Sequence, residues 1–204
     1  MKPKKIIYLE NILRFMAKAI LWKYNPKIVG ITGSVGKTSA KEAVFIALSS
    51  AFRVRKNEKN YNNEIGIPLT IIGTESGDRS VFKWLGVFLK WLAVFIFPVN
   101  YPEILVLEMG VDRPGDMEYL LTFIRPTVGV ITNISGTHLE FFKSIEQILK
   151  EKGKMVFSLP EDGLAILNAD DERIFSFREK LKVPISLFGI GDDSELKASD
   201  LNFN

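Results

Sequence analysis

The residues of this sequence with the clearest chemical potential form a glycine-rich segment, GITGSVGKTSAKEAV, at positions 30–44. It follows the apolar run KIVGIT (27–32) and opens a stretch with helical spacing of apolar residues. Glycines in such a loop let backbone N–H groups turn toward phosphates, and the helix N-terminus adds its dipole. The segment predicts a nucleotide phosphate site, with Lys37 on the β- and γ-phosphates and the Thr38 hydroxyl on Mg²⁺. The predicted contacts are Gly33, Ser34, Gly36, Lys37, Thr38 and Ser39.

A plain turn between a strand and a helix is the structural alternative for this segment. The segment also departs from the strict phosphate-loop pattern, because Ile31 replaces its first glycine and Gly33 lies inside the loop instead. A plain turn does not account for the Gly-Lys-Thr triplet, nor for the strand and helix patterns that flank it. We therefore favour the nucleotide site.

Two further residues could act on a metal ion. Glu108 ends an apolar run, where a carboxylate can hold Mg²⁺ directly or through water, although a solvated acid at a strand end is the alternative. His138 is the single histidine of the chain. Because Mg²⁺ prefers oxygen ligands, chemistry alone favours a structural role for this histidine.

Three asparagines lie in segments expected to be loops. Asn62 and Asn63 belong to NEKNYNNEIGIPLT (57–70), which we expect to be an ordered loop, and asparagine is also an ordinary turn residue. Asn168 is followed by Ala-Asp-Asp, a sequence that could form a helix N-cap. Thr132 and Asn133 likewise fit either a turn or the lining of a site.

These residues require a scaffold that brings strand ends together. Short apolar runs alternate with helical patterns, which predicts an α/β fold with a mostly parallel sheet and flanking helices. Ligands bind beyond the carboxyl ends of such strands, where the polar segments fall. The predicted strands are 27–32, 104–109, 128–133, 164–168 and 185–189, and the predicted helices are 37–50, 114–123, 144–159 and 171–181.

The motifs together resemble a known family. TGSVGKTS resembles the phosphate loop of the Mur ligases, the ATP-dependent amide-bond ligases of peptidoglycan precursor synthesis. Within that family, four other segments are most similar to the member that adds D-alanyl-D-alanine to a UDP-N-acetylmuramoyl-tripeptide. The resemblance covers about 27–200, the P-loop NTPase-like central domain. The four segments are NYNNEIGIPLT (60–70), LEMG (107–110), RPTVGVITNISGTHLEFFKSIEQI (125–148) and KGKMVFS (152–158).

The resemblance implies an enzyme that uses ATP and Mg²⁺ to form an acyl phosphate, which the incoming amine attacks. Its implied substrates are a UDP-N-acetylmuramoyl peptide and D-alanyl-D-alanine, and its implied location is the cytoplasm. It assigns catalysis to Lys37, Glu108, His138 and Lys152, metal binding to Thr38, Glu108, His138 and Lys152, substrate contact to Asn62 and Asn63, and ATP contact to Asn168. Another Mur-type amino acid ligase, or a nucleotide-binding module without ligase activity, remains the alternative.

Lys152 has a predicted modification as well as a predicted role. It falls on the apolar stripe of the helix over 144–159, which Ser144 can cap with Gln147 at the capping-box position. Burial lowers a lysine pKa and favours the neutral amine, which can react with carbon dioxide. The resulting carbamate can bind Mg²⁺, as the resemblance implies for this position. A lysine that snorkels to the helix edge is the alternative.

Composition and charge exclude several classes of protein. The chain has 204 residues, 47% of them hydrophobic, no cysteine and a net charge of +3. This excludes thiolate catalysis and cysteine-based zinc sites. Basic residues concentrate in 1–27, and no basic run continues beyond it, so we expect no nucleic-acid partner.

The expected domains are an amphipathic helical segment at 1–26 and the ATP-binding central domain at 27–204. That domain is expected to be incomplete at its C-terminus, so the chain alone is expected to be inactive. An apolar helical insert is predicted at 81–98, with an uncharged run at 91–102 that is shorter than the ~20 residues needed to span a bilayer. The insert and 1–26 fit peripheral contact with the inner membrane face. Alternatively, these helices pack on each other or on another domain.

Overall fold

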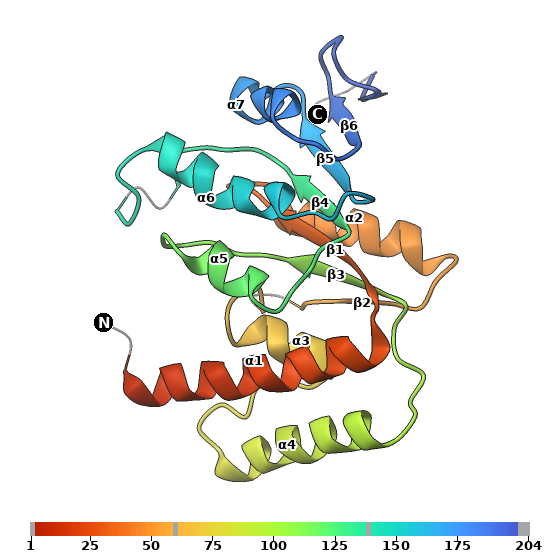
Figure 1. Cartoon of the computed structure of the whole chain (residues 1–204), viewed down its shortest axis with the longest axis vertical. Helices are drawn as coiled ribbons and strands as arrows, with labels where there is room; N and C mark the ends of the chain where they lie inside the picture. Colours follow the sequence, from red (N-terminus) through yellow and green to blue (C-terminus); the bar gives the residue numbers. More distant parts are fainter. Residues whose placement is uncertain (1–2, 59–60, 138–139, 200–204) are drawn as a thin grey trace, which may run out of the picture.

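The computed structural model describes residues 3–58, 61–137 and 140–199. Its centre is a seven-stranded sheet in the order β2-β3-β1-β4-β5-β6-β7 (Figure 1). All six strand pairings are parallel, so the predicted sheet is confirmed. The strands are β1 (Lys27–Thr32), β2 (Val54–Lys56), β3 (Ile104–Glu108), β4 (Val128–Ile131), β5 (Leu164–Asn168), β6 (Ile185–Gly189) and β7 (Leu196–Lys197).

The central strands are apolar because helices cover both faces of the sheet. β3 is buried at every position, and β1 is buried at every position after Lys27. One face packs against α2 (Lys37–Ser49) through Ala40, Val44 and Leu48. The other face packs against α1 (Lys4–Tyr24), α3 (Gly66–Ile72), α5 (Asp116–Leu121), α6 (Ile145–Phe157) and α7 (Glu172–Phe175), as Figure 1 shows. The two edge strands β2 and β7 were not predicted, because three and two residues carry no periodic pattern.

Helix α3 corrects the expectation that 57–70 is entirely a loop. The helix spans Gly66–Ile72, and each of its seven residues is buried. A helix that is buried all round has no amphipathic period to detect, and its proline suggests a turn. Pro68 is tolerated because it lies in the first turn, where its missing N–H would have no helical partner.

Helix α1 packs into the body of the molecule. Ala17 and Ile20 belong to the main core, while Leu13 and Met16 share a second cluster with Leu69 of α3. That cluster also includes Val87 of α4 (Val81–Ile96), so α1 and α4 pack on each other. No helix in the described ranges combines the length and the apolar character that crossing a bilayer requires.

Candidate functional site

The phosphate loop connects the end of β1 to the start of α2. Gly33 and Gly36 have φ values of +150° and +81°, in the region that favours glycine. A Cβ atom on Gly33 would also lie 2.0 Å from Thr132 Oγ1. α2 begins at Lys37 and has no side-chain cap, so its first N–H groups remain available to an anion. The loop therefore has the backbone that an anion-binding cradle requires.

The segment after β4 holds this loop in place. The N–H of Ser34 donates to Asn133 O (2.9 Å), and that of Val35 donates to Asn133 Oδ1 (2.7 Å). Thr132 Oγ1 donates to Val35 O (2.6 Å), and the N–H of Ser135 donates to Ser34 Oγ (2.9 Å). The sequence left Thr132 and Asn133 open between a turn and the site. The structure shows that both brace the phosphate loop.

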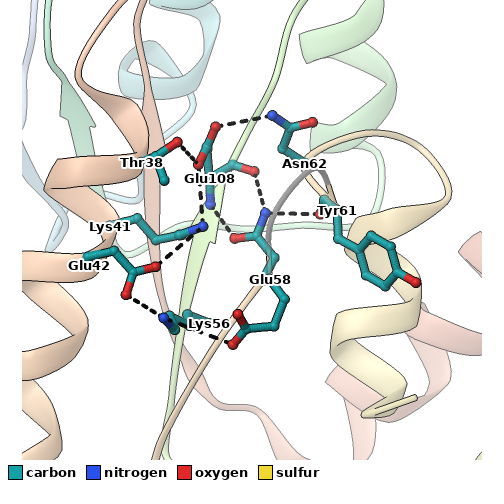
Figure 2. A network of polar contacts seen from close by, with 9 residues as sticks. Thr38, Lys41, Glu42, Lys56, Glu58, Tyr61, Asn62 and Glu108 are labelled. Atoms are coloured by element: carbon teal, nitrogen blue, oxygen red, sulfur yellow. Dashed lines mark hydrogen bonds and ion pairs between the residues drawn. The ribbon is translucent and has the colours of Figure 1, made fainter. Parts of the chain in front are cut away.

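Three of the predicted site residues, Thr38, Glu108 and Asn62, lie together beside the phosphate loop. Thr38 Oγ1 donates to Glu108 Oε2 (2.9 Å), and Asn62 Nδ2 donates to Glu108 Oε1 (3.1 Å), as Figure 2 shows. This arrangement follows from the sheet, because β3 pairs with β1 and Ile31 lies beside Glu108. Glu108 is only 3% exposed, so it is not a solvated strand-end acid.

The other predicted residues of this region are Lys37, Ser39 and Asn63. Lys37 Nζ donates to Ser34 O (3.1 Å), and Ser39 lies exposed in the first turn of α2. Asn63 Oδ1 accepts from the N–H of Gly66 (2.9 Å) and that of Ile65 (3.2 Å), which caps the start of α3. Of the two predicted asparagines, Asn62 contacts Glu108 and Asn63 supports the neighbouring helix.

Sequence reasoning missed two buried residues that hold Glu108. Asn57 Oδ1 accepts from the Glu108 N–H (2.7 Å), and its Nδ2 donates to Glu108 O (3.1 Å) and to Tyr61 O (2.9 Å). Lys41 is 1% exposed, and its Nζ lies 3.5 Å from Glu108 Oε2. One signal was available in the sequence: Lys41 follows Lys37 by four residues and so shares its helix face.

Lys41 continues into a chain of alternating charges, visible in Figure 2. Its Nζ lies 3.8 Å from Glu42 Oε1, and Glu42 also pairs with Lys56 of β2. The Lys56 ammonium holds the pKa of the Glu42 carboxyl below its usual value. The network thereby links α2 to strands β2 and β3 beside the phosphate loop.

Asn168 lies at the next strand end along the sheet. Its Nδ2 donates to Thr132 O (2.7 Å), and its Oδ1 accepts from the N–H of Asp170 (2.9 Å). A pocket of about 560 Å³ opens here, lined by Asn133, Ile134, Asn168, Asp170, Asp171, Glu172 and Arg173. Asp171, not Asn168, provides the N-cap of α7. Asn168 thus joins the β4 end to a pocket beside the phosphate loop.

Lys152 lies on the buried face of α6, as the apolar stripe predicted. Lys150 is exposed, and Lys154 pairs with Glu151 (2.8 Å) and Glu118 (3.1 Å), so the inward position belongs to Lys152. Because Lys152 is only 2% exposed, the alternative that it snorkels to the helix edge is wrong. The predicted cap is also present, because Ser144 Oγ accepts from the N–H of Gln147 (3.4 Å).

Burial, which is the larger cause, and the nearby Lys37 ammonium lower the pKa of Lys152 from 10.5 to about 8. Three carboxylates, on Asp112, Glu151 and Asp116, act in the opposite direction. The two predicted catalytic lysines are therefore close enough to interact electrostatically. His138 lies outside the described residues. In the ranges that are described, no three His, Cys, Asp or Glu side chains gather as a metal site.

The lowered pKa predicts how stability depends on pH. The folded-state pKa lies below the ordinary value, so the cost of burying the charged amine is fully present below pH 8 and disappears as the pH rises toward 10.5. In carbon-dioxide-free buffer, Lys152→Met is expected to be more stable than the parent at pH 7, by up to about 3 kcal/mol. This advantage should shrink between pH 8 and 10.5 in urea unfolding. A difference that does not change with pH, or one shared by Lys150→Met, would contradict the assignment.

Comparisons with known proteins agree with this geometry. The family model "Mur ligase middle domain" matches residues 92–204, more than half of the chain. The chain is 30% identical over 190 residues to the UDP-N-acetylmuramoyl-tripeptide–D-alanyl-D-alanine ligase of Bacillus subtilis (strain 168). That match covers 93% of this chain and 36% of the relative, so the chain spans about a third of the relative's length.

Two solved structures show the same fold. The MurF ligase of Thermotoga maritima in complex with ADP is 30% identical, with a TM-score of 0.69, and the match covers 89% of this chain and 36% of that one. A MurF structure from Acinetobacter baumannii has a TM-score of 0.70 at 23% identity, with 89% and 35% covered, and this likeness concerns the fold alone. With its phosphate loop and buried Glu108 in a seven-stranded parallel sheet, the chain belongs to the Mur ligase family and contains that family's middle domain.

Proposed function

We propose that the chain provides the ATP-binding part of a ligase that joins D-alanyl-D-alanine to a UDP-N-acetylmuramoyl-tripeptide. The observation that carries this proposal is the hydrogen-bonded set of Thr38, Glu108 and Asn62 at the mouth of the phosphate loop. The names of the relatives support the identity of the two substrates. The segments that resemble this ligase favour it over other Mur-type ligases.

The phosphate loop fits the phosphates of ATP. Positive φ at Gly33 and Gly36 shapes the loop before the uncapped N-terminus of α2, and the Lys37 amine adds a positive charge at the loop. The pocket beside Asn168 is on the same sheet edge and is polar enough for a nucleobase or ribose. The Thermotoga maritima relative was solved in complex with ADP, which supports an adenine nucleotide as the ligand.

The donor atoms around Glu108 fit Mg²⁺, which binds oxygen ligands. The Thr38 hydroxyl and the Glu108 carboxylate would hold the ion, with Asn62 orienting the carboxylate. When bound, the ion neutralises charge on the phosphates. His138 and a carbamylated Lys152 would complete a second position, as the family resemblance implies.

The residues of the chain would act on the reactants by position and charge. Lys37 and the N–H groups of α2 hold the γ-phosphate against the peptide carboxylate, which accepts the phosphoryl group while ADP leaves. The amine of D-alanyl-D-alanine then attacks the acyl carbon, and inorganic phosphate leaves as the amide forms. Asn62 and Asn63 lie near the substrate in this arrangement. Because ATP and UDP-linked precursors are cytoplasmic metabolites, we place the reaction in the cytoplasm.

A carbamate on Lys152 is a testable part of this proposal. Carbon dioxide would form an N–C bond with the neutral amine, and the released proton would pass to solvent. Burial favours that neutral amine. With ¹³C-bicarbonate, the protein is expected to show one carbamate carbon resonance that Lys152→Met removes and Lys150→Met leaves. A spectrum without this resonance near pH 8 would contradict the modification.

Product formation tests the proposed reaction. The protein expressed from its complete gene is incubated with ATP, Mg²⁺, the UDP-muramoyl-tripeptide and D-alanyl-D-alanine, and ADP release and product mass are measured. Turnover should require both acceptor substrates and should be lost in Lys37→Ala. ATP binding without acceptor-dependent turnover would favour a nucleotide-binding module instead. Turnover with a single amino acid in place of the dipeptide would favour another Mur-type ligase.

A further inference from the structure

Helix α4 exposes a face that is more apolar than a solvent-facing helix surface normally is. Its inward side contains Val87 and Val94, which are buried, and Trp91, whose Nε1 donates to Met16 O (3.0 Å). The opposite side carries a stripe of three apolar residues spaced by seven, or about two helical turns. They are between 54% and 86% exposed: Phe82, Leu89 and Ile96.

Helix α1 carries a second stripe of the same kind. Tyr8, Phe15 and Trp22 are also spaced by seven and are between 66% and 80% exposed. Tyrosine and tryptophan are the aromatic residues enriched at membrane–water interfaces. The stripe on α1 therefore combines exposed apolar surface with residues that suit such an interface.

The two stripes lie on neighbouring helices that pack on each other, and the exposed surface of this helix pair is here called the α1–α4 face. Lys23 Nζ donates to Val94 O (3.0 Å) and Phe95 O (2.8 Å), which joins the C-terminal ends of the two helices. The rings of Phe15 and Phe88 both lie near Trp91, at centroid distances of 6.4 and 5.6 Å. Figure 1 shows α4 as the outermost helix, alongside α1 and on the far side of it from the sheet.

The exposed charges of the α1–α4 face are basic. Lys83 and Lys90 each follow a member of the α4 stripe in the sequence, and Lys4 and Lys18 lie three or four residues from members of the α1 stripe; all four are exposed. Lys83 also pairs with Asp78, which precedes α4 (3.5 Å). Glu10 is the single acidic residue in the sequence of the two helices, and it is buried. The face thus presents apolar side chains bordered by lysines, with no acidic residue exposed in the described part of either helix.

We propose that the α1–α4 face binds a lipid surface that contains anionic headgroups. Apolar side chains of an interfacial helix enter the boundary between headgroups and acyl chains, and flanking lysines extend to the anionic phosphates. The arrangement matches this mode, because α1 and α4 lie side by side and the lysines border the apolar stripes. The two helices would lie in the plane of the membrane, which requires no spanning segment.

The charge of the α1–α4 face favours an anionic lipid surface over a second copy of the chain as its binding partner. Two copies in contact through this face would bring lysines toward lysines, and like charges across an interface are costly. Neither helix has an exposed acid in its described part to pair with them, and the neighbouring Asp78 already pairs with Lys83 of its own chain. Lysine is also depleted at protein interfaces, whereas it is favoured beside anionic lipid. The observations therefore favour lipid over a second copy.

Vesicle flotation of the protein expressed from its complete gene tests this proposal. At low salt, the protein is expected to float with vesicles of phosphatidylcholine and phosphatidylglycerol more than with phosphatidylcholine alone, and added salt should release it. The double variant Phe82→Glu/Leu89→Glu is expected to bind at least about tenfold less, because each buried apolar side chain contributes that much or more. The matched control, Ile46→Glu/Ile190→Glu, alters two exposed apolar residues elsewhere and should bind like the parent.

Three outcomes would overturn the proposal. The first is a folded parent that stays in the soluble fraction with anionic vesicles at low salt. The second is vesicle binding that Phe82→Glu/Leu89→Glu does not reduce. The third is a dimer that the same variant dissociates, without vesicle binding, which would assign the face to a second copy. Lys37→Ala should float like the parent, so the proposed ligase function can fail without affecting this result.

Discussion

Lys37→Ala is expected to weaken the binding of Mg²⁺–ATP by roughly ten- to a hundredfold. The Lys37 amine lies at the phosphate loop, and a charge-assisted hydrogen bond contributes about 1.5–3 kcal/mol. Isothermal titration calorimetry measures the change directly. Lys150→Ala removes an exposed lysine from α6 and is the matched control, with an expected affinity equal to the parent's. Equal affinities for Lys37→Ala and the parent would contradict the phosphate-loop assignment.

The same variant has a second, independent readout. Lys37 lowers the pKa of Lys152, so its removal should raise that pKa toward its ordinary value. In the Lys37→Ala background, the stability advantage of Lys152→Met should then be smaller and should begin to shrink at a higher pH. This result would show that the two lysines face one site without any nucleotide present.

Lys41→Met is expected to reduce the free energy of unfolding by about 3–5 kcal/mol. The substitution removes the buried cation beside Glu108 and leaves a carboxylate that is also buried, and breaking such a pair from one side has this cost. Urea unfolding of the nucleotide-free protein measures the effect. Lys150→Met is again the surface control, with an expected change within about 0.5 kcal/mol.

A double-mutant cycle separates the ion pair from the packing of the Lys41 side chain. Glu108→Gln removes the charge and keeps one acceptor oxygen, for Asn62, while its NH2 group can donate to the Thr38 hydroxyl, which accepts as well as donates. Adding it to Lys41→Met should recover much of the lost stability, because neither buried charge then remains. Strict additivity of the two changes would show that the Lys41–Glu108 interaction contributes nothing.

Much of the fold could be predicted because parallel strands covered on both faces are continuously apolar. The five predicted strands begin where β1, β3, β4, β5 and β6 begin. Helix α3 escaped prediction because complete burial removed its amphipathic pattern. The sequence predicted the helix of α4 but could not say which of its sides faces the protein, since it is apolar almost all round.

The sequence predicted those site residues that belong to a local sequence motif. Gly33, Gly36, Lys37 and Thr38 form a contiguous pattern, and Glu108 was recognised because it ends an apolar run. Asn57 belongs to no such pattern, and the spacing of Lys41 from Lys37 shows only that the two share a helix face. Their roles depend on contacts with Glu108, 51 residues from Asn57 along the chain.

Patterns of neighbouring residues in the sequence were therefore enough to predict the sheet, the phosphate loop and the inward position of Lys152. Each of these depends on the spacing of residues that are close in the sequence. Tertiary packing alone decided that Asn62 contacts Glu108 while Asn63 caps α3, and that Thr132 and Asn133 brace the loop. It also decided that the side of α4 with Phe82, Leu89 and Ile96 faces outward. The physical reason is that β3 and β4 both pair with β1, which brings strand ends from distant parts of the sequence to one edge of the sheet. The periodic pattern of apolar residues within a strand or helix carries no information about such long-range contacts.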